Sequence, residues 1–270
     1  MEEEFINAVD EGNVEKVRVL LGNPRTDPAA DNNAAIRLSS LNGHTEVVKL
    51  LLNDPRTGPA ADDNFAIGVA SRYGHTDVVK LLLKDSRTNP ADSYNDAIRW
   101  ASHNGHTEVV KLLLNDPRTD PAVNNNIAIR WASEYGHTEV VKLLLNDPRT
   151  DPADKNNEAI RFASKICIVK LLLTDPRVDW RLASDKYKKE LIKNSTNQLK
   201  HELTTNYLLL KQALPKISFV ENGKTVTVSK LPKEIMRKII YLKIYQECKT
   251  NKIPSIKLTC LLKISDNIGQ

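Results

Sequence analysis

The stretch Asn42-Gly-His-Thr-Glu-Val-Val-Lys-Leu-Leu-Leu52 decides how this chain folds, because it recurs almost unchanged. Equivalent stretches begin at Tyr73, Asn104 and Tyr135, always at the same 31-residue interval. The interval also extends toward the N-terminus, and separates Gly12, Gly43, Gly74, Gly105 and Gly136. A fixed period of this length is typical of stacked repeats. Such a stack presents an extended surface rather than one deep pocket.

Residues 93–123 show what each part of the unit does. Asparagine is a favoured helix N-cap, because its side-chain oxygen accepts an unpaired backbone N–H, so we expect Asn95 to begin a short helix. Ala97 and Ile98 supply the apolar face of that helix. Gly105 ends it, because glycine adopts the positive φ of a tight turn. The same asparagine stands in the other full units as Asn33, Asn64, Asn126 and Asn157.

A second helix is predicted from about Thr107, with Glu108 placed favourably for the helix dipole. Residues 109–114 give it a wide apolar face at helical spacing. The connector that follows holds Pro117 and Pro121, which cannot continue a helix. Each unit is therefore predicted to be helix, turn, helix and a turn-rich connector.

This unit resembles the ankyrin repeat. The resemblance is carried by Gly-His-x-Glu-Val-Val-x-Leu-Leu-Leu and by the Ala-Ile-x-x-Ala before it, in series over two-thirds of the chain. Three features differ from the ankyrin pattern, in which units run about 33 residues and open with Thr-Pro-Leu-His. Here the period is shorter, the opening is Ala-Ile-Arg, and the connector reads Asp-Pro-Arg-Thr-Asp-Pro. This variant resembles ankyrin arrays of large DNA viruses that infect protists, which implies a viral protein acting on its host.

The resemblance implies an α fold, an ankyrin solenoid over residues 1–182, and a non-enzymatic scaffold that binds an unidentified client protein. The predicted units are 1–30, 31–61, 62–92, 93–123, 124–154 and 155–182. The last unit lacks three residues between its helices, at Lys165-Ile-Cys-Ile168, so the helices join more tightly there or one is shorter. Residues 183–270 are predicted to form a C-terminal α/β extension.

Near-identical units differ at a few surface positions, which are the candidates for partner recognition. By resemblance, ankyrin arrays bind through their connectors and the exposed side of the first helices. Interfaces favour aromatic and arginine side chains at such places. Free drift at exposed sites is the alternative explanation. The candidates are Arg72, Tyr73, Tyr94, His103, Asn104, Glu134 and Tyr135.

Three further columns recur at the repeat interval. One comprises Leu38, Val69, Trp100, Trp131 and Phe162, which we assign to packing between units rather than to an aromatic binding stripe. Another comprises Arg37, Arg99, Arg130 and Arg161, which we expect to pair with neighbouring aspartates or carbonyls rather than with an acidic partner. The third comprises His44, His75, His106 and His137, which we assign to structural hydrogen bonds rather than to a metal.

The remaining sequence features predict a protein without catalytic activity. We find no nucleophile–base pair, phosphate loop or metal-ligand spacing, and expect no enzyme activity, cofactor, metal or small-molecule substrate. No apolar run approaches a membrane span. The acidic N-terminus lacks a secretory signal, and three scattered cysteines predict a reduced, cytoplasmic location, or the host cytoplasm for a viral protein. We expect a monomer.

The region after residue 182 differs in charge. Residues 183–270 hold 17 Lys and Arg against 7 Asp and Glu, whereas the rest holds 22 against 27. The lysines are dispersed, which favours a solvated face over nucleic-acid binding. Asn222-Gly223 predicts a β-hairpin over 217–228.

The helix predicted over 231–242 opens with Leu-Pro-x-Glu-Ile, and resembles the first helix of an F-box, as found after poxviral ankyrin arrays. The resemblance implies docking to a Skp1-like subunit of a cullin-type ubiquitin ligase. A structural cap on the solenoid is the alternative. The docking candidates are Leu231, Pro232, Ile235, Ile239 and Leu242.

Overall fold

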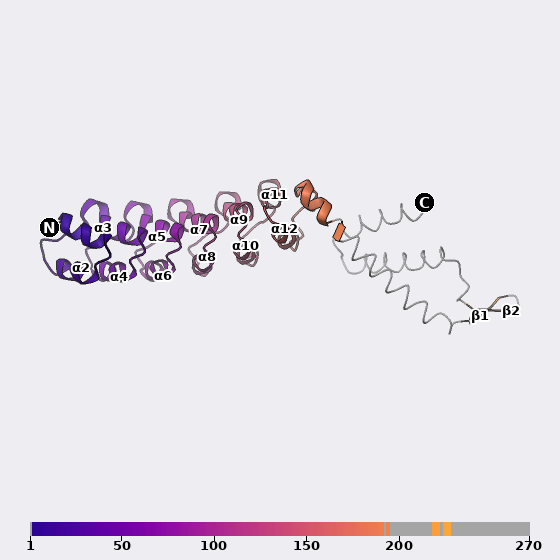
Figure 1. The fold of residues 1–270 in the computed structure, drawn as a ribbon, viewed down its shortest axis with the longest axis horizontal. Coiled ribbons are helices and arrows are strands. Elements are labelled where there is room, and N and C mark those ends of the chain that lie inside the picture. Colours follow the sequence, from indigo (N-terminus) through magenta and orange to yellow (C-terminus); the bar gives the residue numbers. More distant parts are fainter. Residues whose placement is uncertain (1, 192, 195–217, 222–223, 228–270) are drawn as a thin grey trace. The chain divides into compact units, whose positions relative to one another are not determined.

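The computed structural model describes residues 2–191, 193–194, 218–221 and 224–227 (Figure 1). Successive antiparallel helix pairs make up the first compact unit, which ends at Ser184. The pairs are α1 (Glu2–Asp10) with α2 (Val14–Leu21), α3 (Ala30–Leu41) with α4 (Thr45–Asn53), α5 (Ala61–Tyr73) with α6 (Thr76–Lys84), α7 (Asp92–Asn104) with α8 (Thr107–Leu114), α9 (Val123–Glu134) with α10 (Thr138–Leu145), and α11 (Asp154–Arg161) with α12 (Ile166–Leu172). The short 3₁₀ helix η1 (Trp180–Leu182) follows. The predicted helical repeat fold is confirmed.

The first helices of the pairs form one row and the second helices another, as Figure 1 shows. The core lies between the rows and between neighbouring pairs. Ile98 on α7 and Val109, Val110 and Leu113 on α8 are fully buried, and the same positions are buried in the other units after the first. Burial of each such side chain contributes about 1.5–3 kcal/mol. The apolar spacing of the sequence therefore determines which helix faces meet.

The turn between the two helices of a pair is fixed by a glycine and by the histidine of the next unit. Gly74 has φ +77°, and a Cβ added there would lie 2.5 Å from Nδ1 of His106. The Nε2 atom of His106 lies 2.9 Å from the carbonyl oxygen of Arg72. His44, His75 and His137 make the same bond to their preceding units. The prediction of structural hydrogen bonds is confirmed, and these bonds link neighbouring units.

The prediction that Asn95 caps its own helix is wrong. Ser93, Tyr94 and Asn95 form a left-handed turn with φ of 48–58°, at the start of α7. The carboxamide oxygen of Asn95 instead accepts the N–H of Asp120 in the following connector, at 2.7 Å. Asparagine tolerates the left-handed region, which frees its side chain to reach the next unit. The equivalent bonds are made by Asn33, Asn64, Asn126 and Asn157.

The connectors are joined by a charged contact that the sequence pattern does not reveal. Arg118 donates from Nε and Nη2 to the two carboxylate oxygens of Asp116, at 2.9 and 2.6 Å. Its Nη1 also donates to the carbonyl of Thr88 in the preceding connector, at 2.6 Å. The hydrogen bond from Arg118 holds the pKa of Asp116 below its ordinary value. We call this arrangement the Asp-x-Arg clamp; it recurs in Asp54/Arg56, Asp85/Arg87, Asp147/Arg149 and Asp175/Arg177.

The last pair accommodates its three missing residues by shortening its first helix. α11 has 8 residues, whereas α7 has 13. Lys165 lies against Gly136 where the other units place a histidine, and its Nζ donates to the Gly136 carbonyl at 2.7 Å. The backbone N–H of Ser164 also bonds the carbonyl of Ser133, at 3.1 Å. One of the two predicted solutions, the shorter helix, is therefore the one adopted.

In the second compact unit, the structure describes residues 185–191 as helical and two strands, β1 (Ser218–Glu221) and β2 (Lys224–Thr227). The strands pair antiparallel, with Phe219 opposite Val226. The segment 231–242 and the rest of the predicted α/β extension lie outside the described residues, so that extension remains a prediction. Among the described residues, no helix combines the length and apolar character needed to cross a membrane.

Candidate partner-binding surface

Aromatic side chains from α7 and α9 contact one another on the surface of the array. The rings of Trp100 and Trp131 have centroids 5.6 Å apart. The ring of His103 lies 5.4 Å from Trp100, 5.2 Å from Trp131 and 4.2 Å from Tyr135. We call Trp100, His103, Trp131 and Tyr135 the aromatic cluster. Two neighbouring units therefore build one continuous patch.

Arginine side chains extend the aromatic cluster. The guanidinium carbon of Arg72, near the end of α5, lies 4.5 Å from the centroid of Trp100. Arg99 lies 5.6 Å from the centroid of Trp131. Cations at this distance are attracted by the negative face of an aromatic ring. The patch thus combines π surface and positive charge over three units.

The local cause of this arrangement is the helical period combined with the repeat period. Trp100 and His103 are three residues apart on α7, and Trp131 on α9 is four residues before Tyr135, which caps the C-terminal end of that helix. Side chains at these separations lie on one face of a helix. Because the units stack in register, Trp100 comes beside Trp131. The constant repeat interval therefore turns a sequence column into a surface patch.

The predicted recognition residues divide into two groups. Arg72, His103 and Tyr135 meet in or beside the aromatic cluster, and Tyr73, which is 53% exposed, lies next to Arg72. Asn104 donates from Nδ2 to the Arg72 carbonyl at 2.7 Å, and so joins α7 to α5.

Tyr94 is not part of the cluster, because it lies in the left-handed turn at the opposite end of α7. Its side chain is 75% exposed. Glu134 is exposed at the end of α9, beside Tyr135 in the chain. These two residues remain candidates on exposure alone.

The tryptophan column serves two purposes. Trp100 packs against Trp131 across units, which confirms the predicted role in packing. Both rings are nevertheless only partly buried, and Phe162 is 49% exposed. The prediction that this column only packs between units is therefore incomplete, because its side chains are also part of the surface. The available signal was the histidine or tyrosine that follows each tryptophan by one helical turn.

The arginine column pairs largely as predicted. Arg37 Nη1 lies 2.9 Å from Asp62, and Arg130 Nη2 lies 2.5 Å from Glu158, both in the next unit. Arg99 instead pairs with Asp96 of its own unit, at 2.7 Å. Three of the four column arginines thus have an acidic partner within the array, although their buried Nε atoms have no hydrogen-bond partner among the described residues.

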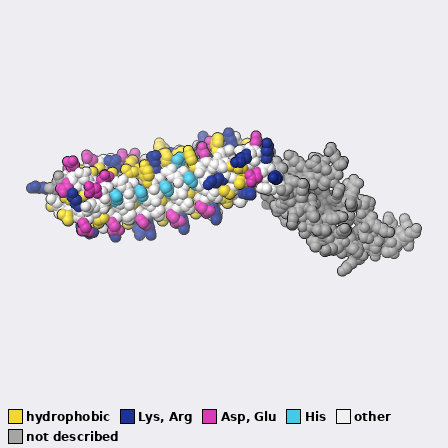
Figure 2. Space-filling view, viewed as in Figure 1, with side chains coloured by type: hydrophobic (Ala, Val, Ile, Leu, Met, Phe, Trp, Pro, Cys, Tyr) yellow, Lys and Arg dark blue, Asp and Glu magenta, His cyan; other side chains and the backbone are white. Residues whose placement is uncertain are grey.

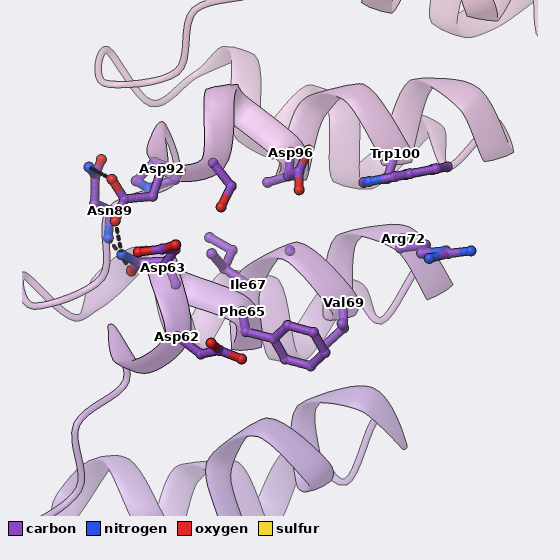
Figure 3. Close-up of a pocket in the computed structure, with 15 residues that line it drawn as sticks. Asp62, Asp63, Phe65, Ile67, Val69, Arg72, Asn89, Asp92, Asp96 and Trp100 are labelled. Carbon is purple, nitrogen blue, oxygen red and sulfur yellow. Dashed lines mark hydrogen bonds between the residues drawn. The ribbon is translucent and has the colours of Figure 1, made fainter. Parts of the chain in front are cut away.

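A cleft lies between α5 and α7 (Figure 3). Figure 3 shows Asp62, Asp63 and Asp92 toward one end of the cleft, and Arg72 and Trp100 toward the other. Asp92 accepts hydrogen bonds from Asn64 and Asn89, at 2.5 and 3.0 Å. The aromatic cluster therefore begins where this acidic cleft ends.

No group of three metal-ligand side chains occurs in the part of the chain that the structure describes. Histidine side chains lie in a row along one face of the array, as Figure 2 shows. His44, His75, His106 and His137 each bond a backbone carbonyl of the preceding unit, as described above. Their positions are explained by the stacking of the units.

The fold and its surface define a class: a helical repeat solenoid whose exposed first helices carry aromatic and charged patches. The family model of ankyrin repeats matches residues 5–92, 69–159 and 98–180, and the chain belongs to the ankyrin-repeat family. Ankyrin repeats mediate protein–protein binding, and the family is generally non-enzymatic. A comparison with curated proteins gave no match.

Proposed function

We propose that this protein binds a client protein through the aromatic cluster. The observation that supports this proposal most directly is the partial exposure of four contacting rings, with Tyr135 51% exposed. Tryptophan, tyrosine and arginine dominate the binding energy of protein interfaces, because they combine a large apolar area with polar groups. Rings already held against one another also lose little conformational freedom on binding. The ankyrin array would thus act as a scaffold that presents a rigid patch.

The test is affinity capture from a lysate of the native cells, with the full chain as bait. Tyr135→Ala removes an exposed ring of the cluster, and Tyr94→Ala is the matched control at the other end of α7. We expect the first substitution to weaken capture of a specific client at least tenfold and the second to leave it unchanged. The reverse result would move the site to the left-handed turns, and equal capture by both variants would contradict the proposal.

A second candidate function rests on the sequence of residues 231–242, which lie outside the described residues. We propose that Leu231, Pro232, Ile235, Ile239 and Leu242 dock a Skp1-like ligase subunit, so that the client becomes a ubiquitination substrate. The only support is the Leu-Pro-x-Glu-Ile opening of this segment. A structural cap is the competing role. Pull-down with a Skp1-like protein decides between them: docking requires binding that is lost in the double variant Ile235→Asp, Ile239→Asp.

A further inference from the structure

The arginine column is interrupted at one unit. Arg37, Arg99, Arg130 and Arg161 occupy the third position of the Ala-Ile-Arg motif, but the second full unit reads Ala-Ile-Gly and places Gly68 there. This glycine is within the right-handed part of α5 and has no positive φ. Backbone geometry therefore does not require a glycine at this position. A Cβ added to Gly68 would meet nothing within 4 Å.

At three other junctions between first helices a column arginine contacts the next helix, whereas the junction of α1 with α3 has Ile6 at the column position. Arg37 pairs with Asp62 and lies 5.6 Å from the ring of Phe65 on α5. Arg99 lies over Trp131 on α9. Arg130 pairs with Glu158 on α11. The junction of α5 with α7 has no column side chain, and that is where the cleft of Figure 3 lies, with Gly68 in its lining.

The acid that such an arginine would meet is nevertheless present. Asp96 stands at the same sequence separation from Gly68 as Glu158 does from Arg130. Arg99 donates a hydrogen bond from Nη1 to Oδ1 of Asp96, whereas Oδ2 of Asp96 has no hydrogen-bond partner among the described residues. Asp63 also lines the cleft, with no ion pair in the described part of the chain. Asp96 is thus paired with Arg99 of its own unit through one carboxylate oxygen, whereas its other oxygen and Asp63 have no cation within bonding distance among the described residues.

We propose that the cleft beside Gly68 receives an arginine side chain of the protein partner, whose guanidinium occupies the place of the absent column arginine and pairs with Asp96. This proposal rests on the proposed scaffold function and specifies the chemistry of its partner. Arginine fits because its planar group can present several N–H donors to a carboxylate, and Arg130 pairs with Glu158 through Nη2 at the equivalent place within this molecule. The aspartates that line the cleft add attraction for a basic segment.

The probe is a pentapeptide with one arginine between glycines, titrated into the isotope-labelled full chain and followed by NMR. The control peptide carries citrulline in place of arginine, which has nearly the same shape but no charge. We expect amide shifts at Gly68 and Asp96 with the arginine peptide only. Asp96→Asn and Gly68→Arg should each abolish them, the second because its own side chain fills the cleft.

Two controls keep the result decisive. Val19→Arg adds the same charge on α2, where the side chain of Val19 is 73% exposed, and should leave the shifts unchanged. Gly68→Arg should not lower the melting temperature, since the position is open. Equal shifts with citrulline, or shifts that persist in Gly68→Arg, would overturn the proposal. If the peptide fails but client capture still depends on Tyr135, the inference falls and the proposed function stands.

Discussion

At the scale of the residue, glycine has two different roles in this chain, one in a turn and one within a helix. Gly105 has φ +77° and faces the ring of His137, so the turn depends on the absence of a side chain. Gly68 lies in a regular helix with open space beside it. Gly105 recurs in the units and its backbone requires it, whereas Gly68 occurs in one unit and its backbone does not require it. We explain Gly68 by the cleft between α5 and α7, which a larger side chain at this position would fill.

Alanine substitutions should separate these two glycines. Gly105→Ala forces a Cβ into the left-handed region and against His137, which should cost about 1–2 kcal/mol or more. Gly68→Ala should stabilise the chain by about 0.5–1 kcal/mol, because alanine is the better helix former. Urea denaturation of the full chain measures both. A loss of stability in Gly68→Ala would show that the glycine has a structural role we have not recognised.

At the scale of the element, each connector after the first is held by an Asp-x-Arg clamp whose bonds reach back into the preceding unit. Arg118 contacts the carbonyls of Thr88 and Leu83 there. Because the aspartate of each clamp has a lowered pKa, the clamp is a source of acid sensitivity. The connectors are therefore joined by charge, whereas the helices are joined by apolar packing.

The clamps should make the folded array less stable as the pH falls. The pKa of Asp116 is lower in the folded than in the unfolded chain, so its contribution is complete above the unfolded value of about 4 and is lost as the pH falls through the folded value. We expect a melting temperature that is level from about pH 7 to 5 and drops below about pH 4. Asp116→Asn should flatten part of this drop. An unchanged pH profile in that variant would show that other carboxyl groups dominate.

Periodicity in the sequence was enough to predict the helix pairs and the glycine turns, and it narrowed the last unit to a tighter joint or a shorter helix. The role of Asn95 was predicted wrongly, because an N-cap is a local pattern whereas the actual bond reaches Asp120 in the next unit. The clamp was missed for the same reason. Of the candidate surface, the exposed residues could be predicted, but the meeting of His103 with Tyr135 depends on how α7 and α9 stack. Long-range contacts between polar side chains are what a single sequence conveys least.

At the scale of the whole molecule, the array is close to one-dimensional. Each first helix packs on the first helix before and after it, and each second helix likewise. The stability of such an array is approximately a sum of unit and nearest-neighbour contributions. A defect at one end should therefore remain local, and the aromatic cluster lies in central units.

Phe5→Ala should test this locality. The side chain of Phe5 on α1 is 2% exposed, and replacing a buried phenylalanine by alanine typically costs about 3–5 kcal/mol. Hydrogen exchange should then show lost protection in α1 and α2, with the amides of α7 to α10 still protected. Uniform loss of protection across the array would mean that the units unfold as one cooperative block.

The bonds between units largely end on main-chain atoms. His106 meets a carbonyl, Asn95 meets an N–H, and Arg118 meets two carbonyls of the preceding unit. Every unit offers these same atoms whatever its side chains are. A gene segment encoding one unit could therefore be duplicated, deleted or exchanged by recombination without a matching change in its neighbours. Such a chain can acquire a new binding surface one unit at a time, while the hydrogen bonds between units stay the same.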